Sequence, residues 1–488
     1  MAGMEVRARS GNPRETEADT RVVPVFEGEP LDDAELQELV DSGEAKPALR
    51  KLAVTHEGAD GNRRKVILVG AGKRAEFDPE RARLAAAATA GRARELGGRS
   101  ISWASPGGDR VAGAIVEGTL LALYRFDRYK SSKDDQEPDE EVASLEVVTP
   151  EGEGDAGRDV ERGRVRAEAQ NAARDLQNIP SNDATPTFLA DRARAIADAH
   201  DKVASEAWDR QQIVDAGMNA LAAVARGSYE EPRLIVLRYE GTDSGPLLGY
   251  VGKAVTFDTG GISIKPSGKM HEMKFDMSGG AAVIEAIGAI AALELPVRIL
   301  AVVPATENMP SGRSVKPGDI IRALNGKTIE VNNTDAEGRL ILADALSYAV
   351  QEGAERIVDL ATLTGAIIVS LGSTYAGLFS NDDDWYEQVH TAGETTGEIG
   401  WRLPLHPEIY ELTKGEYADL TNAAEARKAM SSYAAEFLRQ FVDDRPWVHM
   451  DIAGVAWGLN RAYVGSGASG FGVRTLVELA EQVSGGAA

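Results

Sequence analysis

Apolar residues in this 488-residue chain form short continuous runs, separated by longer segments with helical periodicity. The run Lys65–Gly70 predicts a buried strand, because its four central residues are apolar and a glycine ends it. The alanine-rich segment Arg83–Leu96 and the segment Val111–Tyr124 predict helices packed on the same sheet.

The second half of the chain repeats this alternation. Helices are predicted over Val160–Leu176, from about Phe188, over Gly279–Leu293 and over Leu340–Val350. Strands are predicted at Arg233–Tyr239, Leu247–Phe257, Val297–Ala305, Arg356–Thr362 and Trp447–Gly454. Strands that alternate with helices imply a mixed, mainly parallel sheet covered by helices on both faces, so the predicted fold class is α/β.

Two polar segments suggest how the chain is divided. Lys130–Glu141 predicts a charged loop, and the glycine- and acid-rich segment Pro150–Asp159 predicts a linker. We therefore expect a loose N-terminal tail over residues 1–20, a smaller α/β domain over 21–160 and a larger catalytic domain over 161–488.

Composition narrows the classes of protein. The chain has no cysteine, which excludes disulfides, thiolate metal sites and cysteine nucleophiles. Its net charge of -24 opposes attraction to nucleic acid or to anionic lipid. The N-terminus lacks the apolar core of a signal peptide, and no uninterrupted apolar run reaches the roughly 18 residues of a membrane helix. We expect a cytoplasmic protein without membrane or nucleic-acid partners.

Charged residues interrupt the apolar pattern in three segments. The segment Val251–Lys265 contains Lys253 within a predicted strand, Asp258 at its end before a glycine pair, and Lys265 shortly after. The segment Met273–Gly280 places Asp276 just before a predicted helix. A third segment, Asn332–Leu340, places three charged residues ahead of another helix: Asp335, Glu337 and Arg339.

Each of these residues has an ordinary structural explanation. An aspartate before glycine is typical of a turn, an aspartate before a helix is typical of an N-cap, and Lys253 could protect an edge strand. Together, however, four carboxylates lie where open α/β sheets place ligands: Asp258, Asp276, Asp335 and Glu337. Two divalent cations would neutralise their combined charge, and oxygen ligands suit manganese, magnesium or zinc.

Other catalytic motifs are missing from the sequence. His271 and Glu272 begin a zinc-protease pattern, but Phe275 stands where the second histidine is required. There is no GxSxG motif and no P-loop, so serine-hydrolase and NTPase functions have no support.

The three charged segments resemble the signature blocks of the leucyl aminopeptidase family, the cytosolic two-metal aminopeptidases. The resemblance covers the chain from about Glu168 to the C-terminus, and more weakly an N-terminal domain that is macro-like. It implies a metal-dependent aminopeptidase with two divalent cations per subunit, Mn²⁺ or Zn²⁺. Asp258 and Glu337 would bridge the cations, Lys253 and Asp276 would complete the tighter site, and Asp335 the more exchangeable one.

The resemblance also implies roles around the cations. Lys265 would bind the substrate carbonyl, and Arg339 would hold a bicarbonate that shuttles a proton. The substrate would be bound by Met273, Thr362, Leu363 and Gly365. Peptides with a free N-terminus and a leucine-like first residue are the expected substrates, and a homohexamer is the expected assembly.

Three alternatives remain open from the residues. A two-metal phosphohydrolase would use a similar carboxylate set, but the charged segments of this chain lack the further basic residues expected of one, beyond Lys265 and Arg339. A DNA-binding or regulatory assembly is disfavoured by the net charge of -24. A catalytically inactive scaffold is disfavoured because every chemistry-bearing residue is present.

Overall fold

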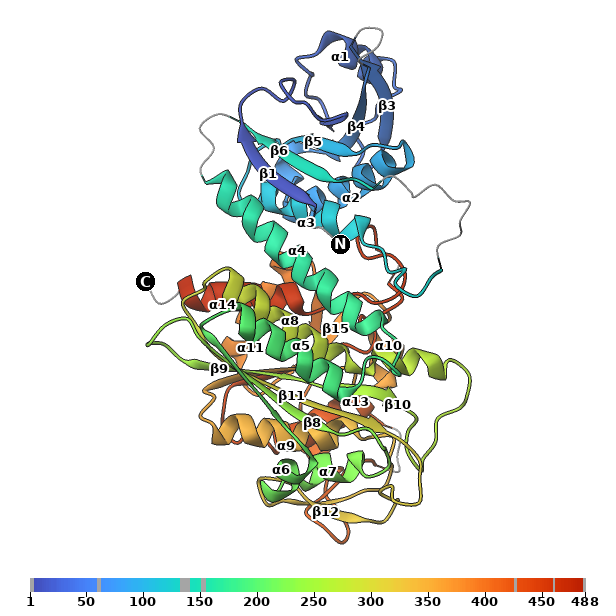
Figure 1. The fold of residues 1–488 in the computed structure, drawn as a ribbon, viewed down its shortest axis with the longest axis vertical. Coiled ribbons are helices and arrows are strands. Elements are labelled where there is room, and N and C mark those ends of the chain that lie inside the picture. The colour runs from blue at the N-terminus through green and yellow to red at the C-terminus, as the bar shows by residue number, and fades with distance from the viewer. Residues whose placement is uncertain are drawn as a thin grey trace. The chain divides into compact units, whose positions relative to one another are not determined.

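The structure, a computed structural model, describes residues 4–58, 63–131, 141–150, 155–424, 428–459 and 461–485. The chain divides into two compact units, Met1–Asn171 with Asn460–Gly465, and Ala172–Leu459 with Ser466–Ala488. Both units are α/β, which confirms the predicted fold class (Figure 1). The division falls within helix α4 (Ala156–Asn178), whereas the sequence places the boundary at residue 160.

The first unit contains a six-stranded sheet. Its strands are β1 (Glu5–Ser10), β2 (Thr20–Phe26), β3 (Leu52–Glu57), β4 (Arg64–Gly72), β5 (Ser100–Ala104) and β6 (Ser144–Thr149). Its helices before α4 are α1 (Ala34–Asp41), the short 3-10 helix η1 (Arg74–Glu76), α2 (Pro79–Glu95) and α3 (Val111–Leu123). The strand order is β1-β6-β5-β2-β4-β3, and β3 is antiparallel to β4 while the other described pairs are parallel. The predicted strand at Lys65 and the predicted helices at Arg83 and Val111 are confirmed.

The expectation of a loose tail is wrong for residues 5–10. These residues form β1, which pairs in parallel with β6. The segment is polar because it contains Arg7 and Arg9. In the structure both arginines contact the buried carboxylate of Glu146 on the neighbouring strand, so their charges are compatible with a strand. An edge strand whose charges are paired across the sheet resembles a solvated tail when only the sequence is read.

The predicted loop and linker lie partly outside the described residues. Residues 132–140 of the loop and 151–154 of the linker are not described. The C-terminal part of the predicted linker is helical, since Ala156–Asp159 form the first turn of α4.

The second unit contains a nine-stranded mixed sheet and a small three-stranded sheet. The large sheet consists of β7 (Val203–Trp208), β8 (Arg233–Glu240), β9 (Leu247–Gly252), β10 (Ala254–Asp258), β11 (Arg298–Asn308), β14 (Arg356–Ala361), β15 (Ala376–Ser380), β16 (Gly400–Arg402) and β18 (Trp447–Asp451). The small sheet consists of β12 (Ile320–Arg322), β13 (Thr328–Glu330) and β17 (Leu420–Thr421). In the large sheet the order is β16-β15-β18-β14-β9-β11-β8-β7, with β10 paired to β11.

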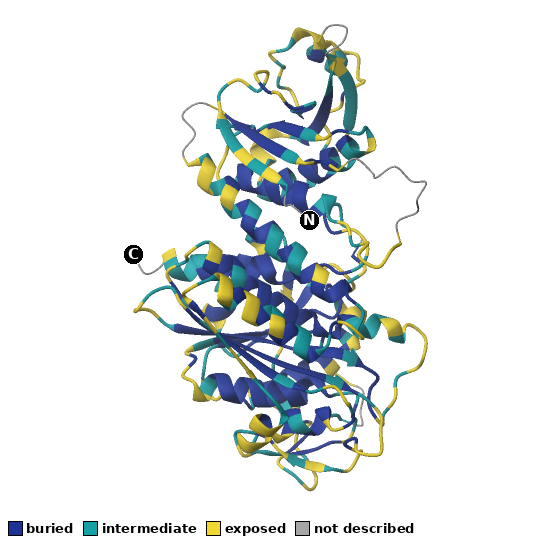
Figure 2. Ribbon diagram, in the orientation of Figure 1, coloured by how far each residue is buried: buried dark blue, intermediate teal, exposed yellow. Residues whose placement is uncertain are grey.

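Helices cover both faces of the large sheet. The helices of this unit are α5 (Pro186–Ala199), α6 (Arg210–Asp215), α7 (Asn219–Ala225), η2 (Met270–Met277), α8 (Ser278–Ala292), α9 (Gly338–Gln351), α10 (Gly365–Leu371), α11 (Asp383–Thr396), α12 (Pro407–Glu411), α13 (Met430–Arg439) and α14 (Val473–Gly485). Helices α5, α8, α11 and α14 lie on one face, and α6, α7 and α9 on the other (Figure 1). The central strands are buried from both sides (Figure 2), which explains their continuous apolar runs. The predicted strands and helices of this half are confirmed, except that the predicted strand Leu247–Phe257 forms two strands.

One buried segment has the composition of a membrane helix. Met270–Ala292, which comprises η2 and α8, is by length and composition apolar enough to span a membrane, although polar residues interrupt it. However, 89% of its most apolar window is buried inside the unit. Its hydrophobicity is therefore accounted for by packing against the sheet.

The predicted strand Leu247–Phe257 is split at Lys253. Before the split β9 pairs with both β11 and β14, whereas among the described strands β10 pairs with β11. The Lys253 amide donates to Leu360 O (3.0 Å), and Lys253 O accepts from the Gly280 amide at the start of α8 (2.7 Å). The sheet therefore opens at the carboxyl ends of its parallel strands, where α/β proteins place ligand sites.

Candidate metal centre

The ammonium group of Lys253 lies between two buried carboxylates at this opening. Its Nζ lies 2.8 Å from Asp276 Oδ1 and 2.8 Å from Glu337 Oε1, and it donates to Thr362 O at 3.0 Å. The Thr362 hydroxyl donates to the same Asp276 oxygen (2.7 Å). Burial acts to lower the pKa of Lys253, but Asp276, Glu337 and Asp258 outweigh it and raise that pKa. The amine is therefore protonated in this arrangement.

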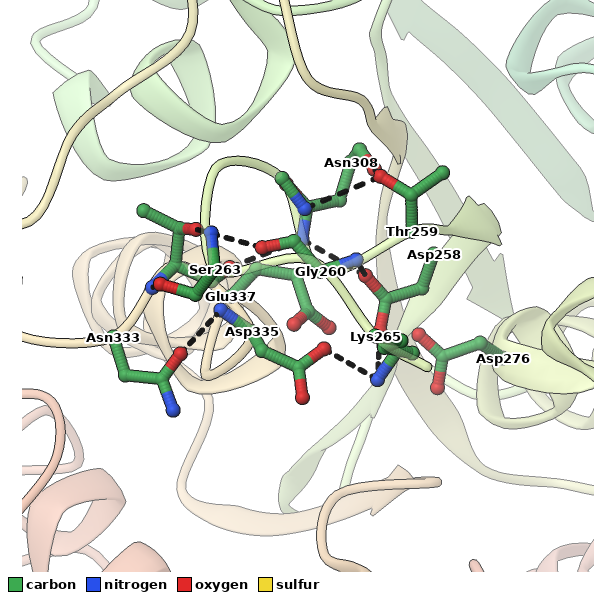
Figure 3. A network of polar contacts seen from close by, with 12 residues as sticks. Asp258, Thr259, Gly260, Ser263, Lys265, Asp276, Asn308, Asn333, Asp335 and Glu337 are labelled. Atoms are coloured by element: carbon green, nitrogen blue, oxygen red, sulfur yellow. Dashed lines mark hydrogen bonds and ion pairs between the residues drawn. The ribbon is translucent and has the colours of Figure 1, made fainter. Parts of the chain in front are cut away.

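Lys265, on the loop after β10, bridges the other two carboxylates. Its Nζ lies 2.7 Å from Asp258 Oδ2 and 2.5 Å from Asp335 Oδ1 (Figure 3). The Lys265 side chain is 22% exposed, against 3% for Lys253, so it is the lysine that a substrate could reach. Burial opposes the charge of Lys265, but Asp258 and its neighbouring carboxylates raise its pKa.

These carboxylates suit divalent cations. One oxygen from each of Asp258, Asp335 and Glu337 can lie within 4.8 Å of the others. Asp276 Oδ2 is buried without a hydrogen-bond partner among the described residues, which is costly unless a positive charge approaches it. Four carboxylates and two ammonium groups leave a net charge of -2, and hard cations prefer such oxygen ligands.

Burial also shifts the pKa values of the carboxyl groups. Burial, with repulsion from Glu337, raises the pKa of Asp258 and raises that of Asp276 well above its ordinary value. For Asp335, burial and the neighbouring carboxylates outweigh Lys265 and raise the pKa to about 6. Burial opposes the charge of Glu337 as well, but the two lysines outweigh it and lower its pKa. The cluster therefore depends on nearby cations to stay ionised.

A tight loop after β10 aims Asp258 into the cluster. Asp258 Oδ1 accepts from the Gly260 amide (2.8 Å) and from Asn308 Nδ2 (2.8 Å). Gly260 has φ of +84°, and a Cβ there would lie 2.6 Å from Ser263 O and 2.8 Å from Asp335 Oδ1. Only glycine fits this turn, because it tolerates positive φ and leaves room for the second carboxylate.

Three polar side chains that the sequence analysis did not select support the ligand loops. Asn308 Nδ2 donates to Thr334 O (3.0 Å) as well as to Asp258, and Thr334 Oγ1 donates to Gly260 O (2.6 Å). The third, Asn422, contacts the loop that carries Asp335. Thr334 precedes Asp335 within the segment Asn332–Leu340, but no short spacing connects Asn308 or Asn422 to the motifs, so long-range packing brings these two asparagines there.

Arg339 lies in the first turn of α9 and is buried. Its Nη1 donates to Asn422 O (2.7 Å), and its guanidinium lies 5.4 Å from the centre of the Tyr433 ring. Its Nε has no hydrogen-bond partner among the described residues. Burial lowers the pKa of Arg339, but a guanidinium remains charged in proteins. An anion at the start of α9 would complement this charge.

One cavity of about 360 Å³ collects every residue that the sequence and the resemblance single out. Those residues are Lys253, Asp258, Lys265, Met273, Asp276, Asp335, Glu337, Arg339, Thr362, Leu363 and Gly365. A second cavity of about 690 Å³ shares Lys265, Asp335 and Arg339 with the first and extends toward Met430 and Tyr433. Lys265 therefore lines both cavities.

Comparisons with known proteins cover both units. A family model described as "Cytosol aminopeptidase family, catalytic domain" matches residues 171–477, and one described as "Cytosol aminopeptidase family, N-terminal domain" matches residues 22–133. The chain is 45% identical to a probable cytosol aminopeptidase of Solibacter usitatus, over 95% of this chain and 96% of that protein. It is 44% identical to one of Roseiflexus castenholzii, over 97% of this chain and 98% of that protein.

A solved structure is also similar along the whole chain. It is described as "Bottromycin maturation enzyme BotP in complex with Mn", and the two share 35% sequence identity with a TM-score of 0.85. The similarity covers 96% of this chain and 100% of the other.

Proposed function

This chain belongs to the cytosol aminopeptidase family and is a metal-dependent aminopeptidase, and we propose from that premise which substrates it takes and which residues act. It removes leucine-like residues from the N-termini of peptides, with Lys265 and Arg339 as its catalytic side chains. The observation that carries this proposal is the cluster of four carboxylates, three of them buried, bridged by two lysines at the carboxyl edge of the sheet.

The cluster would hold two divalent cations, with Mn²⁺ or Zn²⁺ as the proposed metals. Asp258 and Glu337 would be ligands of both cations, Lys253 and Asp276 would be further ligands of one, and Asp335 of the other. The manganese named in the related BotP structure supports this choice. Lys253 must give up the proton that its carboxylate neighbours favour before it can be a ligand. When bound, two cations would lower the pKa of a bound water toward about 7 and so supply a hydroxide near neutral pH.

Lys265 would stabilise the charge that develops on the substrate carbonyl oxygen. Its raised pKa keeps it cationic at neutral pH, and its partial exposure lets it reach a substrate in the cavity. Arg339 would hold a bicarbonate, because its buried guanidinium is charged and lies at the start of a helix, where anions are favoured. Its Nε has no hydrogen-bond partner among the described residues. A bicarbonate in this position supplies an oxygen that can accept and return a proton.

The carboxylate cluster also accounts for action at chain ends. A free N-terminus carries a basic amine that a carboxylate and cation site can bind, whereas an internal peptide bond has none. Met273, Thr362, Leu363 and Gly365 line the same cavity and would bind the first residue of the peptide. The apolar members of this set favour a leucine-like side chain.

The remaining proposals concern assembly, location and the limits of the domains. We expect a homohexamer, a cytoplasmic location, and neither membrane nor nucleic-acid partners. The division into residues 21–160 and 161–488 is proposed as the limit between an accessory and a catalytic domain. Light scattering of the purified protein tests the hexamer directly.

The proposal is tested by reconstituting metal-stripped protein. Hydrolysis of leucine p-nitroanilide is measured before and after adding Mn²⁺, Zn²⁺, Co²⁺ or Mg²⁺, with N-acetyl-leucine p-nitroanilide as the control that lacks a free amine. We expect one or more cations to restore hydrolysis of the free-amine substrate alone. Cleavage of the acetylated substrate would contradict the N-terminal requirement. If no cation restores hydrolysis of any of several aminoacyl substrates, but the protein hydrolyses a phosphodiester, the phosphohydrolase alternative would be favoured.

A further inference from the structure

The side-chain amide of Asn422 holds the loop between β13 and α9. Its Oδ1 accepts from the amides of Asn332 (2.8 Å) and Asn333 (3.2 Å). Its Nδ2 donates to Asn333 O (2.7 Å) and to Ala336 O (3.3 Å). The side chain is fully buried, and these four contacts use both donors and both acceptor positions of the amide.

The backbone of Asn422 extends this contact in two directions. Its amide donates to Glu330 O (3.0 Å), which continues the pairing of β17 with β13. Its carbonyl accepts from Arg339 Nη1 (2.7 Å). One residue therefore joins the small sheet, the loop and the buried arginine.

The loop that Asn422 holds carries two of the four carboxylates. Asp335 lies between the two carbonyls that accept from Asn422, those of Asn333 and Ala336, and Glu337 follows directly. The Asn333 side chain in turn accepts from the Asp335 amide (2.9 Å). The positions of both carboxylates thus depend on a side chain that is not among the residues lining either cavity.

We propose that Asn422 is a positioning residue for the metal centre, and this inference rests on the proposed function. It holds Asp335, Glu337 and Arg339 opposite Asp258 and Asp276, which come from other elements. An asparagine with a purely structural role would also have all of its donors and acceptors hydrogen-bonded. The two explanations differ in where a substitution acts, because a structural role affects the whole unit and a positioning role affects one side of the metal centre.

The expected effect falls on the cation beside Asp335. This carboxylate is 32% exposed, and the loop that Asn422 holds carries it. The cation beside Lys253 and Asp276 shares Glu337 of this loop, but its other proposed ligands come from β9–β10 and η2, which Asn422 does not contact, so its affinity should fall less. Loss of hydrogen bonds behind metal ligands typically costs on the order of 10–100-fold in metal affinity or activity.

The test compares Asn422→Ala and Asn422→Asp with the wild type and with Asn325→Ala. Asn325 is a suitable control because it also belongs to the region of the small sheet, donates to Gln440 O (3.1 Å) and accepts from the Lys327 amide (3.1 Å). Asn422→Asp keeps the volume and the acceptor but loses the donor to the loop carbonyls. Mn²⁺ binding to metal-stripped protein is measured by equilibrium dialysis, and kcat and KM are measured across Mn²⁺ concentrations.

We expect the wild type and Asn325→Ala to bind two Mn²⁺ per subunit. Both Asn422 variants should bind one Mn²⁺ with an affinity closer to that of the wild type and need about 10–100-fold more Mn²⁺ for the second. At limiting Mn²⁺ kcat should fall, and excess Mn²⁺ should restore part of it, which a general loss of folding would not allow.

Three results would overturn the inference. Wild-type Mn²⁺ binding and turnover in both variants would show that the loop does not need Asn422. Equal weakening of both cations, or failure of both variants to fold, would make Asn422 a determinant of the fold as a whole. A wild type that neither binds Mn²⁺ nor hydrolyses aminoacyl substrates would refute the proposed function itself and remove the basis for the inference.

Discussion

Lys253 Nζ and Glu337 Oε1 lie 2.8 Å apart, although Lys253 interrupts a strand and Glu337 precedes a helix. The residue after Glu337 makes this approach possible, because a Cβ at Gly338 would lie 2.7 Å from Lys253 Nζ. The start of α9 therefore packs directly against the lysine that joins β9 to β10.

Gly338→Ala should displace Lys253 and disrupt the metal centre. The added methyl group would overlap Lys253 Cε and Nζ, the end of a flexible side chain, so the lysine should move away from its carboxylate partners. We expect reduced metal content and a lower kcat, measured by metal analysis and leucine p-nitroanilide hydrolysis. Gly268→Ala is the control, since a Cβ there meets open space. Equal metal content in the two variants would mean that Lys253 moves aside without consequence.

Asp258→Ala and Glu337→Ala should each lose metal and nearly all activity. Both residues are the proposed bridging ligands, and both are almost fully buried within the cluster. Metal content and turnover are measured beside Asp319→Ala, a substitution at an ion pair away from the cluster. Wild-type metal content and turnover in either cluster variant would refute the ligand assignment.

Lys265→Ala should bind metal normally and lose mainly turnover. Removing a donor that stabilises a developing oxyanion typically costs on the order of 10²–10³-fold in kcat. Lys269→Ala is the control, because it removes another lysine near the cavity that is exposed. If Lys265→Ala instead loses metal while retaining its fold, the lysine has a structural role in the cluster.

The affinity for one cation should depend on pH through Asp335. Its pKa is raised from 3.8 to about 6, so below pH 6 the free protein holds a proton that the cation must displace. The apparent affinity of the weaker Mn²⁺ should fall roughly tenfold for each pH unit below 6 and level off above it. Mn²⁺ titrations between pH 5 and pH 8 check this. Constant affinity over that range would show that Asp335 is ionised throughout.

Asp344 should make the stability of the second unit depend on pH. This buried carboxyl accepts from the amides of Ala220 and Leu221 (2.9 Å each) and Leu324 (2.8 Å), yet burial raises its pKa from 3.8 to about 7. Because the folded-state pKa is the higher one, its contribution is complete below about pH 3.8 and is lost as pH rises to about 7.

Asp344→Asn provides the matched comparison for this effect, because the amide cannot ionise. The stability of the wild type relative to this variant, measured by urea unfolding, should decrease from pH 5 to pH 8. A difference that stays constant would show that the three backbone amides keep the carboxyl ionised throughout.

Much of the architecture follows from local patterns in the sequence. The apolar runs predict the central strands because a strand buried on both faces has no polar positions. The charged segments around Asp258, Asp276 and Asp335 stand out for the same reason, since they interrupt that pattern at the ends of strands and the starts of helices. Hydrophobic periodicity and the spacing of charged residues within a segment depend only on residues close in the sequence, so the sequence alone reveals them.

What tertiary structure alone decided is which distant residues meet. The sequence does not indicate that Asn308 bonds to Asp258, that Asn422 holds the loop of Asp335, or that β1 pairs with β6. Single asparagines and a polar edge strand carry no local periodicity to distinguish them. Their contacts depend on the pairing and register of strands far apart in the chain, which long-range packing sets.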